Sequence, residues 1–375
     1  MKIADFGVEK WMNEYENDAI YNIAETCVES ITIEQLLEIA NMKEKAINDI
    51  IEMKMTYGAI EGSEEFRNEL LKLHNNSNLT IENTTLTHGA TGANALVYET
   101  LIDPNDHVIV FVPTYQQHYS IPEALHADVQ LIELDFEDDY IPNLEKLKAA
   151  IKPNTKVICL NNPNNPTGAL IDDGTLNEIV KIARENDIYI VCDEVYRGLH
   201  HDRGYTPSIV DLYDKGISTG SLSKVYSLAG LRLGWIVGPK EFIDKVNTHR
   251  DYNTISCGKI DDYLGTIALK NKDKILERNI KLVNDNVAVL DEWVRKSKYI
   301  DYVKPVAGTT AFLKYNIDIP SATLCHNLMR DTGVMLVPGS VMQNEGYLRI
   351  GYANSTEILI KGLEIFEEYL DNITK

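Results

Sequence analysis

The sequence has few positive charges for its length. Of its 375 residues, 36 are Lys or Arg and 57 are Asp or Glu, which gives a formal net charge of −21. Nucleic acids and anionic membrane surfaces are bound mainly through Lys and Arg. The charge therefore argues against both as partners, although it is compatible with a local basic pocket for one phosphate or carboxylate.

Cysteines and long apolar runs are also scarce. The five cysteines form no C-x-x-C pair, and they stand at positions 27, 159, 192, 257 and 325. This pattern favours reduced, mostly buried thiols in a cytoplasmic protein over a disulfide framework or a zinc site. The longest apolar runs, such as Val108–Val112, are far shorter than a membrane span. The charged stretch 1–21 lacks the apolar core of a secretory signal.

The middle of the chain alternates between two kinds of pattern. Short apolar runs, typical of strands buried on both faces, occur at His107–Val112, Val129–Leu134, Lys156–Leu160, Ile188–Cys192 and Gly234–Val237. Helical patterns lie between several of them, including Thr91–Ile102 and Asp172–Asn186. This alternation predicts an α/β fold with a mainly parallel central sheet flanked by helices.

The two ends of the chain predict a second, smaller α+β unit. A capping-box sequence at Thr32–Gln35 predicts a helix that continues toward Met53. Asp273–Lys296 predicts a long amphipathic helix, and a link between domains is favoured over a coiled coil because its pattern ends after about three heptads. We therefore predict an N-terminal arm with part of the small domain, a large domain and a small C-terminal domain, at residues 1–44, 45–275 and 276–375.

One lysine is surrounded by groups that suit a phosphorylated ligand, in the segment SLSKVYSLAGLRLG (221–234). The hydroxyls of Ser221 and Ser223 and the guanidinium of Arg232 could together hold one phosphate. Lys224 could then form an imine with a carbonyl of the same ligand. A surface loop rarely combines S-x-S-K with G-x-R-x-G, so we favour a binding site over a solvated lysine.

Two more polar motifs follow predicted strands, where open α/β sheets bind their ligands. The segment NNPNNPTG (161–168) offers amides suited to a phenolate or carboxylate oxygen, with a rigid turn as the alternative. Asp193 follows an apolar predicted strand, and a carboxylate buried there would need a cationic or donor partner, such as a protonated pyridine nitrogen. The alternative is that Asp193 is an ordinary helix N-cap. The turn GATG (89–92) opens a helix suited to phosphate, but it is not the G-x-G-x-x-G of a nicotinamide dehydrogenase.

Together these motifs resemble those of the class I and II aminotransferases, which are pyridoxal 5'-phosphate (PLP) enzymes of fold type I. The motifs that match follow the order and spacing of this family over most of the chain: YGAIEGSEEFR (57–67), THGATGA (87–93), FVPTY (111–115), NNPNNPTG (161–168), DEVYRGL (193–199), SLSKVYSLAGLRLGW (221–235) and YLRIGYA (347–353). One motif alone would be weak, whereas the set is highly specific.

The resemblance implies a role for each candidate residue. Lys224 would hold PLP as an imine and then move a proton between the substrate Cα and the cofactor, and Asp193 would keep the pyridine nitrogen protonated. The other implied contacts are Tyr196 and Asn165 at the phenolic oxygen, Tyr115 stacked on the ring, Ser221, Ser223, Arg232, Ala90 and Thr91 at the phosphate, Arg349 with Asn165 at the substrate α-carboxylate, and Tyr57 at the phosphate of a neighbouring subunit. The Tyr57 role implies a homodimer with shared active sites.

The chemistry also sets an expectation for the lysine. The freed Lys224 amine must be neutral to accept a proton. We expect desolvation and nearby cationic groups to lower its pKa toward working pH.

The sequence departs from the family pattern on the substrate side. The stretch Tyr21–Ser30 replaces a short apolar strand and glycine. Within it, Glu25 or Glu29 either binds a cationic substrate side chain or is simply solvated, and solvation is the plainer interpretation. Asn164 stands where a histidine is common. No second arginine is obviously placed for a dicarboxylate side chain, so strict aspartate specificity is not expected.

The leading hypothesis is a PLP-dependent aminotransferase that moves an amino group from an L-amino acid to a 2-oxo acid through Lys224. A carbon–sulfur β-lyase, or a cyclase or oxidase acting on a modified arginine, would share the same site. A non-catalytic sensor that binds the cofactor is a third hypothesis, disfavoured because such regulators usually carry a DNA-binding domain. We expect no metal.

Overall fold

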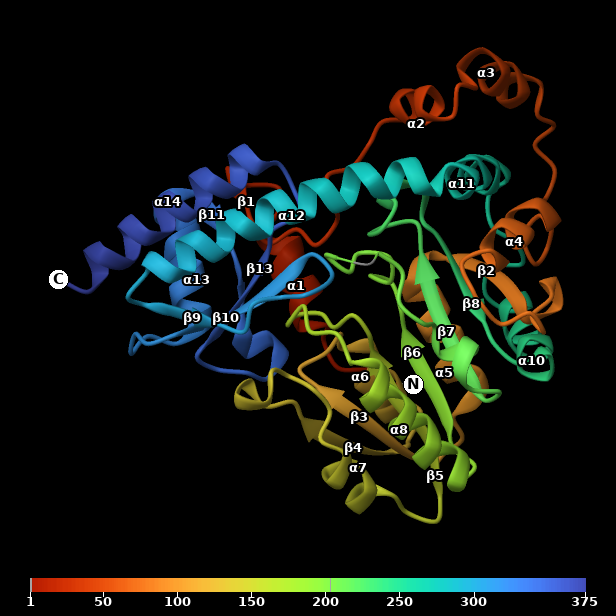
Figure 1. Ribbon diagram of the computed structural model, residues 1–375, viewed down its shortest axis with the longest axis horizontal. Coiled ribbons are helices and arrows are strands. Elements are labelled where there is room, and N and C mark those ends of the chain that lie inside the picture. The colour runs from red at the N-terminus through yellow and green to blue at the C-terminus, as the bar shows by residue number, and fades with distance from the viewer. Residues whose placement is uncertain (1, 203) are drawn as a thin grey trace.

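The protein is described from a computed structural model that covers residues 2–202 and 204–375. In this part of the chain the larger of the sheets has seven strands, drawn in orange, yellow and green in Figure 1. In sheet order they are β2 (Thr84–His88), β8 (Leu233–Val237), β7 (Gly216–Ser221), β6 (Tyr189–Asp193), β5 (Thr155–Asn161), β3 (His107–Val112) and β4 (Asp128–Glu133).

This sheet confirms the predicted mainly parallel architecture. Neighbouring strands run parallel from β7 through β6, β5 and β3 to β4, whereas β8 is antiparallel to both of its neighbours. The five predicted apolar runs coincide with strands to within a residue or so at each end. The apolar runs did not predict β2 and β7, because their sequences, TTLTH and GISTGS, are polar or rich in Gly.

Side chains alternate between the two faces of the larger sheet, as a strand requires. On β3, for example, Ile109 and Phe111 join one core cluster while Val108 and Val110 join the other. Helices cover both faces, so both clusters are shielded from water. These helices are α5 (Gly89–Leu101), α6 (Gln117–Ala124), α7 (Leu144–Ala150), α8 (Asp173–Glu185), α9 (Ile209–Leu212), α10 (Lys240–Asp251) and α11 (Lys259–Lys270).

A smaller sheet, drawn in blue in Figure 1, lies beside the larger one. The pairing of its strands is antiparallel throughout the described residues. Its strands and flanking helices are β12 (Val337–Pro338), β13 (Tyr347–Gly351), β10 (Thr310–Tyr315), β9 (Ile300–Tyr302), α13 (Ser321–Thr332) and α14 (Thr356–Ile373). The predicted long helix is confirmed as α12 (Lys272–Lys296), which runs past both sheets and packs on α14.

The N-terminal segment belongs spatially with this smaller sheet. Strand β1 (Tyr21–Asn22) pairs in parallel with β11 (Val334–Met335). Helix α1 (Gly7–Tyr15) lies between the two sheets, where the indole of Trp11 donates a hydrogen bond to the carbonyl of Leu336, 2.8 Å away. This pairing agrees with the predicted N-terminal contribution to the small domain. The exact boundaries at 44/45 and 275/276 stay a prediction.

The helix predicted from Thr32 toward Met53 is wrong in its length. The capping box is present, since the Thr32 hydroxyl accepts from the backbone N–H of Gln35 and the Gln35 side chain accepts from that of Thr32. However, α2 (Ile33–Ile39) stops, and α3 (Lys43–Glu52) begins after a break. Asn41 adopts a left-handed backbone with φ of 53°. Asparagine tolerates this conformation better than most residues, and it ends the helix there. Helix α4 (Glu64–Leu71) follows.

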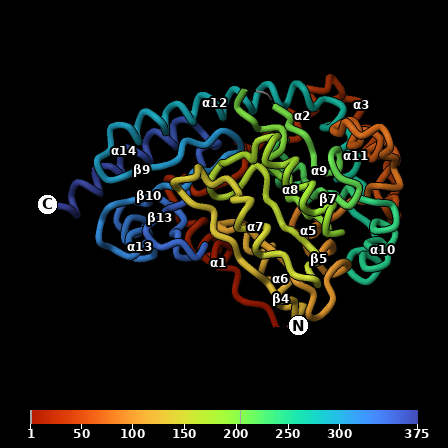
Figure 2. The backbone as a smooth tube through the Cα atoms, turned by 60° about the horizontal axis from the view of Figure 1, so that its bottom comes forward, coloured from red at the N-terminus to blue at the C-terminus, as the bar shows by residue number. Residues whose placement is uncertain are grey.

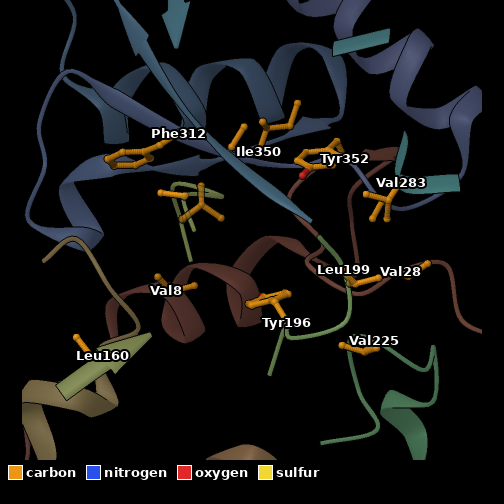
Figure 3. Close-up of a cluster of buried hydrophobic side chains, with 14 of the residues drawn as sticks. Val8, Val28, Leu160, Tyr196, Leu199, Val225, Val283, Phe312, Ile350 and Tyr352 are labelled. Atoms are coloured by element: carbon orange, nitrogen blue, oxygen red, sulfur yellow. The ribbon is translucent and has the colours of Figure 1, made fainter. Parts of the chain in front are cut away.

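A single hydrophobic core connects the two sheets. Figure 3 shows Val8 of α1 and Tyr196 below Phe312 and Ile350 of the smaller sheet and below Tyr352, which follows β13. All of these side chains belong to one buried cluster. The five cysteines are free and buried, as predicted. The two ends of the chain lie well apart (Figure 2), and no helix among residues 2–202 and 204–375 has the length and apolar character needed to cross a membrane.

Candidate active site

A cavity of about 510 Å³ opens where strands of the larger sheet end beside α1 and β13. Parallel strands end at the same edge, which is why residues distant in sequence meet there. The lining includes every predicted site residue except Tyr57: Ala90, Thr91, Tyr115, Asn165, Asp193, Tyr196, Ser221, Ser223, Lys224, Arg232 and Arg349.

One end of the cavity is built to bind an anion. Ala90 and Thr91 stand at the N-terminus of α5, where backbone N–H groups carry partial positive charge. Ser221 and Arg232 line the cavity beside them. The close approach of β8 to the start of α5 depends on Gly234, because a β-carbon at that position would lie 2.4 Å from the carbonyl carbon of Gly89. A guanidinium, two hydroxyls and a helix N-terminus suit a phosphate.

The carboxylate of Asp193 lies at the end of β6 and is 3% exposed. Its Oδ2 accepts a hydrogen bond from Asn94 at 2.9 Å and lies 3.5 Å from Nε2 of His118. Its Oδ1 accepts from the backbone N–H of Val195 at 3.0 Å. No helix begins at Asp193 in the described chain, so the N-cap alternative is wrong. A carboxylate held in this way offers a partner to a protonated ring nitrogen.

The amine of Lys224 lies in the middle of the cavity wall. Its Nζ donates to the hydroxyl of Thr26 at 2.6 Å and to Sγ of Cys27 at 3.1 Å, and it lies 3.8 Å from Oε1 of Glu25. Burial lowers the pKa of this amine, but Cys27, Tyr196 and Glu25 raise it by more, and the net direction is upward. The pKa of Lys224 is therefore raised in the protein without cofactor. The expected lowering concerns the amine that is freed from bound cofactor, and it stays a prediction.

Polar and aromatic groups surround the space between Asp193 and Lys224. The backbone N–H of Asn165 donates to the side chain of Asn161 at 2.8 Å, while Oδ1 of Asn165 is buried and has no hydrogen-bond partner in the described part of the chain. The hydroxyl of Tyr115 donates to Glu9 at 2.9 Å. Burial raises the pKa of both Tyr115 and Tyr196, so both phenols are protonated and can donate. The unpartnered amide oxygen indicates a site that a ligand completes.

Arg349 supplies a second buried cation. It lies on β13, is 3% exposed, and donates from Nη2 to the carbonyl of Ala24 at 3.1 Å. Its Nε has no partner among the residues described. Burial lowers the pKa of the guanidinium from its ordinary value, which is so high that the group keeps its charge. A buried guanidinium with a free N–H suits a substrate carboxylate.

Tyr57 is the predicted site residue that this chain does not bring into the cavity. Its side chain is 75% exposed. Asn164, at the position where a histidine is common, has a local structural role: its Oδ1 accepts from the hydroxyl of Thr167 at 2.8 Å. Glu29, one of two candidates on the substrate side, lies outside the cavity and pairs with Arg278 at 3.2 Å, whereas Glu25 lines the cavity.

Sequence reasoning missed several residues around the two central groups. Thr26 and Cys27 contact Lys224, and Asn94 and His118 contact Asp193. Asn94 had a detectable signal, since a fully buried amide on an apolar helix face must find partners, and its Oδ1 accepts from Thr219 at 2.7 Å. The lining residues contributed by α1 had no signal beyond amphipathicity.

Comparison with known proteins shows the family. The family model described as aminotransferase class I and II matches residues 32–363, and the chain belongs to that family. A capreomycidine synthase from Streptomyces vinaceus is 29% identical, over 76% of this chain and 73% of its own length. An aspartate aminotransferase from Thermotoga maritima is 28% identical, over 76% and 75%. The crystal structure of a PLP-dependent aminotransferase from Streptococcus suis 89-1591 has a TM-score of 0.95 and 43% identity, covering 99% of both chains.

Membership of this family means that the protein is an enzyme of the aminotransferase class and that its cofactor is PLP. The residues present fit that cofactor. The anion site at α5 and the buried acceptor of Asp193 suit a phosphate and a ring nitrogen, and the side-chain amide of Asn165, through its NH2 donor, suits a phenolic oxygen. Lys224 lines the same cavity, and its amine donates a hydrogen bond to the hydroxyl of Thr26.

Proposed function

We propose that the protein transfers the amino group of an L-amino acid to a 2-oxo acid. The observation that carries this proposal is the presence of Lys224, Asp193 and Arg349 in one cavity. These are the three groups that amino-group transfer needs: an amine that binds a carbonyl, an acid for the cofactor ring and a cation for the substrate carboxylate. When bound, PLP supplies an electron-accepting ring that stabilises negative charge at the substrate Cα.

The chain's own residues then have separate tasks. Arg349, with the amide of Asn165, binds the α-carboxylate and so fixes the orientation of the substrate. Asp193 keeps a proton on the ring nitrogen, and the hydrogen bond from Asn94 holds that carboxylate in place. Lys224 holds the cofactor at rest and takes the Cα proton when its amine is free. Ser221, Ser223 and Arg232, with the backbone of Ala90 and Thr91, hold the phosphate while these bonds exchange.

A single-turnover experiment tests this reaction. The PLP-loaded enzyme is mixed with an amino acid donor and no acceptor. An aminotransferase should release one equivalent of the corresponding 2-oxo acid per active site and then stop, and a different 2-oxo acid should restart it. Continuous release of pyruvate and ammonia without an acceptor would instead indicate a carbon–sulfur β-lyase.

A cyclase is the second candidate, and the similarity to a capreomycidine synthase supports it. Such an enzyme would share the cavity but close a ring within its substrate. The same single-turnover experiment separates the two, because a cyclase releases neither a 2-oxo acid nor ammonia and keeps the substrate nitrogen in its product.

We also propose that the protein acts as a homodimer in the cytoplasm. Tyr57 is exposed, as are several other large apolar side chains of the described residues, and free, buried cysteines suit a reducing compartment. These side chains include Ile47, Ile51, Met55, Ile60 and Tyr252. Sedimentation should give twice the chain mass of 42.3 kDa. A monomer that keeps full activity would contradict the shared-site assignment of Tyr57.

A further inference from the structure

The first residues of the chain form one side of the cavity. We call this surface the N-terminal wall, and its members are Phe6, Val8, Glu9, Met12, Glu16, Ala24, Glu25, Thr26 and Cys27. Three of them are carboxylates and none is basic. The other members are mostly apolar or small, so the three carboxylates are the main polar groups of the wall.

The three carboxylates share one electrostatic environment. Oε1 of Glu25 accepts from the backbone N–H of Cys27 at 2.7 Å, and Glu9 accepts from Tyr115. Glu16 is exposed, and all three carboxylates line the same cavity. Burial raises the pKa of Glu16, the charges of Glu25 and Glu9 raise it further, and Lys224 lowers it. Repulsion between them makes the wall favourable for a cation.

The basic groups of the cavity do not neutralise this wall once the site is filled. Among the described lining residues the bases are Lys224, Arg232 and Arg349. In the proposed reaction Lys224 is engaged by the cofactor, Arg232 by its phosphate and Arg349 by the substrate α-carboxylate. Asp193 is matched by the ring nitrogen. The carboxylates of the N-terminal wall are then left without a positive partner.

Two buried groups show where an amino acid would lie relative to this wall. Oδ1 of Asn165 and Nε of Arg349 have no partner within the described chain, and both residues line the cavity with exposures of 5% and 3%. A ligand that places its carboxylate at Arg349 and its own amine at Lys224 lies beside Glu25, because Oε1 of Glu25 lies 3.8 Å from Nζ of Lys224. A substrate side chain that extends toward the N-terminal wall would meet Glu25 and the other two carboxylates of the wall.

We propose that the amino acid donor has a positively charged side chain, a guanidinium or an ammonium, bound by Glu16 and Glu25 with Glu9 nearby. This rests on the proposed function and adds the substrate class. No arginine lines the cavity, among the residues described, to receive a second substrate carboxylate besides Arg232 and Arg349. A dicarboxylic donor would therefore meet three carboxylates and no described base on this wall.

The test compares donors of nearly equal shape and different charge. L-Arginine is compared with L-citrulline, and L-lysine with L-norleucine, in steady-state kinetics with a saturating 2-oxo acid acceptor and in calorimetric titrations of the PLP-loaded enzyme. We expect the wild type to prefer the cationic member of at least one pair by about tenfold in kcat/KM, as two partly exposed ion pairs would give. The Glu16→Gln/Glu25→Gln double variant should lose most of this preference, chiefly through the KM of the cationic donor. Because Glu25 also acts on the amine of Lys224, the readout is the ratio of the two donors in each pair and not the rate with either donor alone.

Control measurements separate this proposal from the proposed function. Glu29→Gln is the matched control, since Glu29 is exposed, outside the cavity and close in sequence to Glu25; it should keep the wild-type preference. Equal or better use of the neutral donors, or of aspartate, would overturn the substrate class while leaving amino-group transfer intact. If no donor releases a 2-oxo acid, the proposed function fails, and calorimetry still decides whether the wall prefers a cation.

Discussion

The two sides of the cavity are built in different ways. On the cofactor side, the residues follow strands β5, β6 and β7 or open helix α5, so the parallel sheet places them. On the N-terminal wall, they come from a nine-residue helix and an irregular segment beside the smaller sheet. The comparison indicates that the sheet fixes the common chemistry of the site, while a separate segment is free to set which substrate is accepted.

The largest effect should come from the cofactor side, at Lys224. We expect Lys224→Ala to reduce amino-group transfer by about 10³-fold or more, because the carbonyl-binding amine and the proton carrier are both lost. The measurement is the single-turnover rate with excess donor. Lys181→Ala changes an exposed lysine on α8 and should retain wild-type activity. An active Lys224→Ala enzyme would remove the basis for placing the chemistry on this side.

Asp193 should rank second. Asp193→Asn keeps the shape of the side chain but removes its charge, so the ring nitrogen loses its anionic partner. We expect a loss in kcat of about 10²-fold, comparable to the removal of one well-placed electrostatic group. The rate should be measured at saturating donor, with the PLP content of each preparation determined chemically. A change in KM alone would mean that Asp193 serves binding rather than chemistry.

Arg349 lies where the two sides meet and should affect binding more than chemistry. We expect Arg349→Gln to raise the KM for an amino acid donor by about 10–100-fold, which corresponds to the loss of charge-assisted hydrogen bonds. A primary amine that lacks the α-carboxylate offers an internal control, since its slow reaction should not depend on Arg349. Equal loss with both compounds would show that the substitution disturbs the smaller sheet instead.

The smallest expected effect links the two sides of the cavity, because Glu25 of the N-terminal wall acts on Lys224 of the cofactor side. Because Glu25 helps to raise the pKa of Lys224, the amine of the cofactor-free protein is protonated at neutral pH. Covalent uptake of PLP should therefore accelerate as pH rises and more of the amine becomes neutral. Glu25→Gln lowers the Lys224 pKa and should accelerate PLP uptake at pH 7 by about two- to tenfold. A fall of up to about one pKa unit raises the neutral fraction of the amine by that factor. Stopped-flow absorbance measures this rate, and slower uptake by the variant would contradict the assigned direction.

Much of the cofactor side was predictable from sequence because its signals are local. Strand ends, a glycine turn and the S-x-S-K segment each have a recognisable pattern, and the sheet brings them together. The apolar pattern did not predict strands β2 and β7, because their sequences are polar or rich in Gly. The break between α2 and α3 depends on the backbone of Asn41, which the capping box does not reveal.

The N-terminal wall was largely unpredictable for a physical reason. Which of Glu25 and Glu29 faces the cavity depends on the course of an irregular segment, and the partner of Glu29 lies on α12, far along the chain. The direction of the Lys224 pKa likewise depends on burial and on Cys27, Tyr196 and Glu25, which only the folded chain brings to the amine.

The most direct test of the central claim is to find the lysine that carries PLP. Borohydride reduction of the PLP-loaded enzyme, followed by peptide mass spectrometry, converts a lysine–cofactor imine into a stable link. Attachment of one phosphopyridoxyl group per chain, at Lys224, is the predicted result. A label on another lysine, or no label in an enzyme that contains PLP and is active, would contradict the account.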